Sequence, residues 1–203
     1  MVRVKVFIDS QNCYRDARRT FFAPAEPSTK GQVSPRRFGE VLAALRKAPP
    51  DRQLTQVRVY TGRPNSTRDP KTYGAHMRQC AKWGREQDVL VVPRSLRYPR
   101  NWPDERAQEK GIDVQLAVDL VRGYVADEFD IGIVASTDTD LLPAIEAVLE
   151  LDRRHGYDPV EVSAWHARGY SQQLRIAGRN LYGHDLPVHV YNRVADSTDY
   201  NVH

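Results

Sequence analysis

The sequence predicts an α/β protein: a three-layer α/β/α sandwich with a central, mainly parallel sheet. Short runs rich in β-branched residues alternate with helical patterns along the chain, as in parallel strands joined by crossover helices. Hydrophobic residues make up 40% of the 203 residues and charged residues 28%, as in ordinary soluble domains. This length suits one core, so we expect a single domain over residues 1–194 and a loose polar tail over residues 195–203.

The first half of the chain is expected to hold three strands and two helices. The strands are runs rich in Val, Ile and Leu, at residues 2–8, 54–61 and 88–92. One helix follows Ser34 and Pro35, where serine caps the helix and proline takes its first position, and it ends near residue 48. The other helix covers residues 70–86. Residues 13–33 are mixed in character and include a loop rich in proline.

The second half alternates helices and strands in the same way. A helix over residues 109–126 is apolar nearly all round, so we expect it to be buried. The next strand, at residues 129–135, leads into a helix over residues 141–155. The remaining elements are expected to be a strand at 160–165, a short helix at 171–177 and a short strand at 188–191.

Two carboxylates, Asp138 and Asp140, follow the strand at residues 129–135 and are separated by one residue. A helix start needs one oxygen-bearing cap, which Thr139 or Asp140 could provide, so capping alone leaves an acid unexplained. In open α/β sheets, ligands bind just beyond the carboxyl ends of the strands. The two acids are therefore candidates for a functional site.

Asp9 and Asp113 are expected to reach the same edge of the sheet. Asp9 ends the first strand, and Asp113 lies near the start of a helix, where the preceding strands end. Each has a structural alternative: Asp9 as a loop or capping residue, and Asp113 as an acid stabilised by the helix dipole or by Lys110. Four carboxylates at one edge would repel one another without a cation, and oxygen ligands suit Mg²⁺ or Mn²⁺.

Asp119 lies on the same predicted helix but points elsewhere. From the geometry of an α-helix, its side chain lies about 120° around the axis from Asp113 and roughly 9 Å along it. The two carboxylates cannot easily bind one ion. Asp119 is therefore expected to support the site indirectly or to pack the helix.

Charge is distributed unevenly along the chain, although the net charge is only +4. Residues 1–100 hold 21 Lys and Arg against 8 Asp and Glu, whereas residues 101–203 hold 9 against 18. This asymmetry indicates a basic face and an acidic focus, or else a solvated surface on which charges happen to segregate. Two basic loops, 62–71 and 93–108, carry the cations that we expect to contact nucleic acid: Arg63, Arg68, Lys71, Arg94, Arg97 and Arg100.

The second basic loop also contains aromatic residues. Arginine beside an exposed aromatic ring suits phosphate contact combined with base stacking. It equally suits an arginine that only packs on the ring. The sequence leaves both readings open.

Several classes of site are absent from the sequence. There is no Gly-x-x-x-x-Gly-Lys phosphate loop, no Gly-x-Gly-x-x-Gly fingerprint, no Gly-x-Ser-x-Gly motif and no His-Glu-x-x-His motif. The six histidines show no ligand spacing, and Cys13 and Cys80 are expected to be free thiols. No apolar run approaches the roughly 18 residues of a membrane span. The chain enters a strand without a signal-peptide pattern, so we expect no membrane partner and a cytoplasmic location.

An acidic metal site in basic surroundings favours phosphodiester hydrolysis. The metal would activate water and neutralise charge on the scissile phosphate, and the cations would hold the nucleic-acid backbone. A phosphohydrolase for small phosphoesters is a weaker alternative, because a haloacid-type phosphatase needs Asp-x-Asp after the first strand and Gln11 stands in that place.

Three motifs together resemble the NYN domains of the PIN-like nuclease superfamily. They are Asp9-Ser-Gln-Asn12, the stretch from Lys110 through Asp113 to Asp119, and Ser136-Thr-Asp138-Thr-Asp140. The resemblance covers about residues 2–165. It implies a PIN-like sandwich and a Mg²⁺- or Mn²⁺-dependent endoribonuclease that acts on single-stranded or structured RNA. Only this resemblance favours RNA over DNA, and it also allows a homodimer.

The resemblance further implies roles for individual residues. The acids that correspond to metal ligands are Asp9, Asp113 and Asp138. Asp140 corresponds to a fourth catalytic acid or a capping partner. The positions that correspond to substrate or supporting residues are Asn12, Ser136 and Lys110. PIN-type enzymes often carry a further acid after the second strand, and residues 60–65 offer none, which indicates weaker metal binding. An RNA-binding or regulatory module with little cleavage is therefore the alternative function.

Overall fold

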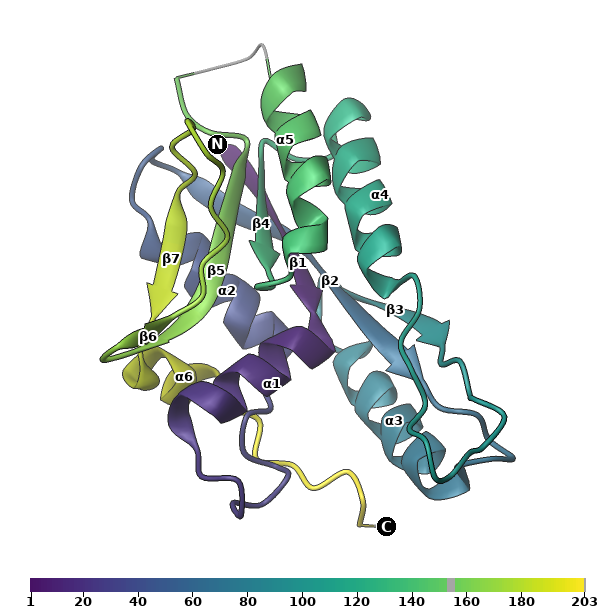
Figure 1. Cartoon of the computed structure of the whole chain (residues 1–203). Helices are drawn as coiled ribbons and strands as arrows, with labels where there is room; N and C mark the ends of the chain where they lie inside the picture. The colour runs from purple at the N-terminus through teal and green to yellow at the C-terminus, as the bar shows by residue number, and fades with distance from the viewer. Residues whose placement is uncertain (153–155, 203) are drawn as a thin grey trace.

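The structure is a computed structural model that describes residues 1–152 and 156–202. It has the predicted architecture, a central sheet between two layers of helices (Figure 1). Within the described residues, six strands run parallel in the order β3-β2-β1-β4-β5-β7, and a short β6 pairs antiparallel with β5. The strands are β1 (Val2–Asp9), β2 (Arg52–Arg63), β3 (Val89–Ser95), β4 (Ile131–Ala135), β5 (Val160–Ala167), β6 (Tyr170–Ser171) and β7 (Gly183–Leu186).

The helices form the two outer layers. They are α1 (Ser10–Phe21), α2 (Pro35–Leu45), α3 (Pro70–Trp83), α4 (Ile112–Val125), α5 (Leu142–Leu151) and α6 (Val188–Val194). Helices α4 and α5 cover one face of the sheet, α1, α2 and α6 cover the other, and α3 lies beside β3 (Figure 1). Because the strands are parallel, the carboxyl ends of β1, β2 and β4 meet at one edge of the sheet.

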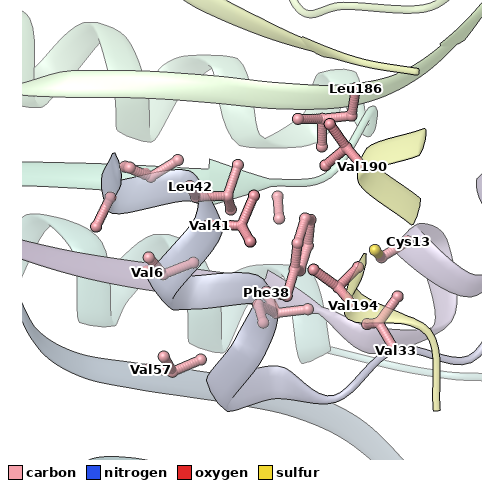
Figure 2. Packing of buried hydrophobic residues seen from close by; sticks show 14 of the residues in the cluster. Val6, Cys13, Val33, Phe38, Val41, Leu42, Val57, Leu186, Val190 and Val194 are labelled. Atoms are coloured by element: carbon pink, nitrogen blue, oxygen red, sulfur yellow. The ribbon is translucent and has the colours of Figure 1, made fainter. Parts of the chain in front are cut away.

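Each face of the sheet buries its own apolar cluster. In β1, Val6 and Ile8 belong to the cluster under α1, α2 and α6, whereas Phe7 belongs to the cluster under α4 and α5. Figure 2 shows the first cluster, in which Phe38 and Leu42 of α2 lie over the strands. Burial on both faces explains why β4 is a continuous apolar run in the sequence and why the second half of β1, Val6 to Ile8, is apolar as well.

The five strands predicted up to residue 165 and the helices predicted between them are confirmed, with boundaries shifted by a few residues. Ser34 caps α2 as expected, because its Oγ accepts a hydrogen bond from the Arg37 backbone N–H at 3.4 Å. The helix predicted at residues 141–155 is a 3₁₀ turn, Thr139–Leu141, followed directly by α5. Its predicted end, residues 153–155, lies outside the described residues.

Two predicted elements are wrong, and one helix was not predicted. Helix α1 escapes a pattern search because its buried stripe has only two apolar side chains, Cys13 and Ala17. Residues 172–177 form no helix. The alternating run at residues 188–191 is part of helix α6, because its apolar side chains share one helical face on the core; the edge strand there is β7.

Helix α4 is buried on one face only, contrary to the expectation of burial all round. The exposed fractions of Val114, Val118 and Val125 are 59%, 44% and 65%. The sequence therefore carries more apolar surface on α4 than the fold buries. No helix in the described residues is both long and apolar enough to cross a membrane.

The segment expected to be a loose tail, residues 195–203, carries two buried side chains, Asp196 and Tyr200. Tyr200 donates its hydroxyl hydrogen bond to Asp196. Lys82 of α3 donates to the Asp196 carboxylate at 3.0 Å, so this segment packs against α3.

Candidate acidic site at the sheet edge

Asp9 closes β1 and caps α1. Its Oδ1 accepts a hydrogen bond from the Asn12 backbone N–H at 3.1 Å, and its side chain is buried. The Ser136 hydroxyl lies 3.5 Å from Asp9 Oδ2 and donates to it. Burial raises the pKa of Asp9, the charges of Asp138 and Asp113 raise it further, and the Asn12 and Ser136 hydrogen bonds lower it. Asp9 is therefore a partly desolvated acid with two other acids in electrostatic range.

Asp138 is the cap of the turn after β4. Its Oδ1 accepts from the Asp140 backbone N–H at 3.0 Å, and its own N–H donates to Ser136 Oγ at 3.2 Å. The sequence placed this cap at Thr139 or Asp140, which is wrong. Asp140 is exposed, and of the two acids it is the one whose side chain does not cap the turn.

Asn12 joins α1 to the loop after β4. Its Oδ1 accepts from the backbone N–H of Thr137 at 2.9 Å and from the Thr137 hydroxyl at 3.1 Å. Strands β1 and β4 are neighbours, with Ile8 paired to Ala135. This link holds the two strand ends, and hence Asp9 and Asp138, in a fixed relation.

Asp113 lies in the first turn of α4, which no side chain caps. Gly111 at the cap position has φ of 73°, a left-handed conformation that favours glycine. Lys110 is exposed and makes no ion pair with Asp113 in the part of the chain that the structure describes. The structural alternative of a Lys110–Asp113 pair is therefore wrong, whereas the helix-dipole explanation stays compatible with the position of Asp113.

Glu109 is an acid that the sequence analysis did not select. Its carboxylate lies against Gly62 at the end of β2, where a Cβ added to the glycine would stand 2.7 Å from Glu109 Oε1. Burial raises the pKa of Glu109 to about 7, the charges of Asp9 and Asp113 add to the rise, and Arg15 and the Gly62 backbone N–H oppose it. An acid does stand at the end of the second strand, but it comes from the loop before α4.

The acids of the site suit a hard cation in their chemistry, but they are not yet close enough together to bind one. Asp9, Asp113, Asp138 and Glu109 offer only oxygen donors, and their mutual repulsion would be relieved by a cation. Among the described residues, however, no three His, Cys, Asp or Glu side chains are close enough to form a ready metal-binding group. Asp9 thus lies within electrostatic range of the other three acids, and the four would have to approach further to share an ion.

Asp119 lies in the packing between α4 and β2. Its Oδ2 accepts from the Tyr60 hydroxyl at 3.0 Å, its Oδ1 accepts from Gln115 Nε2 at 3.0 Å, and Arg58 Nη1 lies 3.6 Å away. These partners account for its carboxylate. Of the two roles expected for Asp119, the structure shows helix packing.

The two basic loops lie side by side beyond the ends of β2 and β3. The Leu96 backbone N–H donates to Arg63 O at 3.0 Å, and the Asn65 N–H donates to the Tyr98 hydroxyl at 2.9 Å. Arg68 packs over the Tyr98 ring at 5.6 Å from its centroid, and Trp102 meets that ring edge-on. The aromatics therefore fasten the loops, while the six predicted cations are exposed: Arg63, Arg68, Lys71, Arg94, Arg97 and Arg100.

An acidic sheet edge beside exposed cations, on a parallel sheet between two helical layers, defines an α/β protein whose candidate site lies at the carboxyl ends of its strands. The family model described as NYN domain matches residues 3–176. The chain belongs to the NYN domain family, a branch of the PIN-like nuclease superfamily.

Other comparisons add little. None of the curated proteins matches the chain. A crystal structure of a protein of unknown function from Vibrio parahaemolyticus is similar, with 17% sequence identity over 81% of this chain and 80% of that chain and a TM-score of 0.46. A similarity of this size carries no argument about function.

Proposed function

We propose that the chain is a metal-dependent endoribonuclease whose site is the acidic sheet edge. The observation that carries the proposal is that Asp9 and Asp138, from neighbouring strands, are linked through Ser136. Asp113 and Glu109, from the start of α4 and the loop before it, lie in electrostatic range of Asp9. Membership of a nuclease superfamily supports this activity. RNA as the substrate rests on the family alone.

Asp9, Asp113 and Asp138 would hold Mg²⁺ or Mn²⁺, with Glu109 or Asp140 as a further oxygen ligand. The cation would activate water and offset charge on the scissile phosphate. Asn12 and Ser136 keep Asp9 and Asp138 in position, and the exposed arginines would bind the RNA backbone. We expect products with 5′-phosphate and 3′-hydroxyl ends.

The test is cleavage of labelled single-stranded and hairpin RNAs with Mn²⁺, with Mg²⁺ and with EDTA. We expect metal-dependent cleavage by the wild type and none by Asp9→Asn or Asp138→Asn. Asp51→Asn is the matched control, because Asp51 is exposed and precedes β2 at the opposite edge of the sheet. Activity that survives both site substitutions would contradict the proposal.

A second function, RNA binding with little cleavage, is favoured by one observation. No ready three-ligand metal group exists among the described residues. In that case RNA binding would persist in EDTA, and no RNA in the panel would be cut with either metal. A cytoplasmic location and a homodimer stay predictions that sedimentation and cell fractionation would test.

A further inference from the structure

A pocket of about 380 Å³ opens beside the acidic edge. It lies between the start of α1, the end of β2 and helix α3. Ser10 and Gln11, which directly follow Asp9, line one side, and Glu109 lines another. Since Asp9 is close enough to raise the pKa of Glu109, the pocket and the acidic site share a boundary.

The pocket has walls that suit a flat polar group. Trp83, His76 and Tyr14 contribute aromatic rings, and the amide side chains that line it are Gln11, Gln32, Gln79 and Asn201. The Trp83 ring is 4% exposed, and its Nε1–H has no hydrogen-bond acceptor among the described residues. Gln79 and Gln32 meet only through a long 3.4 Å contact, so their amides are poorly satisfied by each other.

The charge of the lining disfavours a phosphate inside the pocket. Among the described residues that line the pocket there is no Lys or Arg, and Glu109 contributes a carboxylate. Burial lowers the pKa of His76, so its ring is neutral at neutral pH. A neutral, planar ligand with hydrogen-bonding edges is therefore favoured over an anion.

We propose that this pocket holds one unstacked nucleobase of a single-stranded RNA, from a nucleotide next to the phosphate at the acidic edge. The inference rests on the proposed function, because the acids at the boundary set where the phosphate lies. Pockets of about 300–1,000 Å³ accept small organic groups. Single-stranded bases are recognised by stacking on aromatic rings and by hydrogen bonds to their edges, for which amide groups offer both donors and acceptors.

The test combines a pocket variant with removal of single bases. Ala75 of α3 lines the pocket, so Ala75→Phe fills it, and Ala81→Phe makes the same change on the exposed side of the same helix. Gln79→Ala is a milder second variant. Binding of labelled RNAs with an abasic ribose at each position in turn is measured by fluorescence anisotropy in EDTA, and circular dichroism checks that each variant folds.

Base removal at one position should weaken binding to the wild type on the order of 10-fold, the size of a lost stacking contact. Ala75→Phe should weaken binding of intact RNA by a similar factor and Gln79→Ala by a smaller one. Neither variant should add to the loss from the abasic position, because the variant and the missing base abolish the same contact between base and pocket. Ala81→Phe should behave as the wild type.

Independent, multiplying losses from Ala75→Phe and from base removal would overturn the inference. So would a wild type that is insensitive to base removal at every position, or nucleoside monophosphates that bind as tightly as RNA. Because binding is measured without metal, the outcome is separate from cleavage. Coupled losses without cleavage would keep the pocket and reject the nuclease, and cleavage without coupling would do the reverse.

Discussion

Glu109 is an acid held where its charge is unfavourable. Burial and the charge of Asp9 raise its pKa to about 7, and only Arg15 and the Gly62 N–H act in the opposite direction. Such strain is common at functional sites, where a bound cation or substrate restores the balance. At the scale of single residues, the acidic edge is therefore expected to lower the stability of the metal-free protein.

Glu109→Gln tests this expectation through pH. Because folding raises the pKa of Glu109, its protonated form contributes to the stability of the fold. This contribution is complete below the ordinary pKa of 4.5 and is lost as the pH rises through about 7. In EDTA at pH 8, the variant should thus be more stable than the wild type, by about 1 kcal/mol once partial solvent exposure is allowed for. The difference should disappear at pH 5.

Urea unfolding at both pH values measures the effect of Glu109→Gln. Glu146→Gln, an exposed acid on α5, is the control and should change stability equally little at pH 5 and pH 8. A Glu109 variant that is less stable than the wild type at pH 8 would show that the carboxylate stabilises the fold.

Asn12→Ala tests the link between the two strand ends. The change removes the acceptor of the Thr137 N–H and hydroxyl hydrogen bonds and leaves two donors without their partner. We expect a loss of about 1–3 kcal/mol in the free energy of unfolding. Cleavage should fall further than stability explains, since Asp9 and Asp138 lose their fixed relation. Asn192→Ala, on the exposed side of α6, is the matched control in both assays.

At the scale of elements, the end of β2 is shaped by a neighbouring loop. Arg97 and Gln108 exchange two backbone hydrogen bonds, at 2.9 and 2.8 Å, which fold the second basic loop back on itself. The return of the loop brings Glu109 against Gly62. An added Cβ at Gly62 would overlap Leu96 Cδ2 and lie 2.7 Å from Glu109 Oε1, so the ends of both side chains would have to move aside.

Gly62→Ala should therefore displace Leu96 and Glu109. We expect a loss of about 1 kcal/mol, the low end for overpacking, because both side chains can move aside. The pH effect attributed to Glu109 should be lost as well. Gly74→Ala is the contrasting control, because its Cβ would meet nothing closer than 3.4 Å and alanine favours the interior of α3. Thermal unfolding of both variants measures the difference in stability. A Gly62→Ala variant as stable as the wild type would contradict the packing argument.

The difference between Asp9 and Glu109 shows what the sequence can predict. Asp9 ends one strand and Asp138 lies just beyond another, both strands are visible in the sequence, and parallel pairing then brings both acids to one edge. Glu109 reaches that edge only through the fold of a long loop, which no local pattern encodes. Helices α1 and α6 were missed or misread for a related reason, since each buries too few apolar residues to show a clear period.

At the scale of the whole molecule, an acidic sheet edge lies beside loops that carry exposed cations. The acids gather where β1, β2 and β4 end, and the exposed cations lie on the two loops beyond β2 and β3. A polyanion would be attracted by the loops and repelled by the metal-free acids. Binding of RNA should consequently be salt-dependent and should tighten when a divalent cation is present.

Replacing Arg97 and Arg100 with glutamine tests the role of the loops. Each phosphate contact to a single strand contributes about 0.7 to the slope of log affinity against log salt, so the double variant should lower the slope by about 1.4. Anisotropy titrations of single-stranded RNA at several salt concentrations, from low to moderate, measure this slope. Arg168→Gln with Arg175→Gln removes two exposed arginines beyond β5 and should leave the slope unchanged. Equal slopes for the two double variants would mean that binding follows the net charge of the protein rather than its distribution.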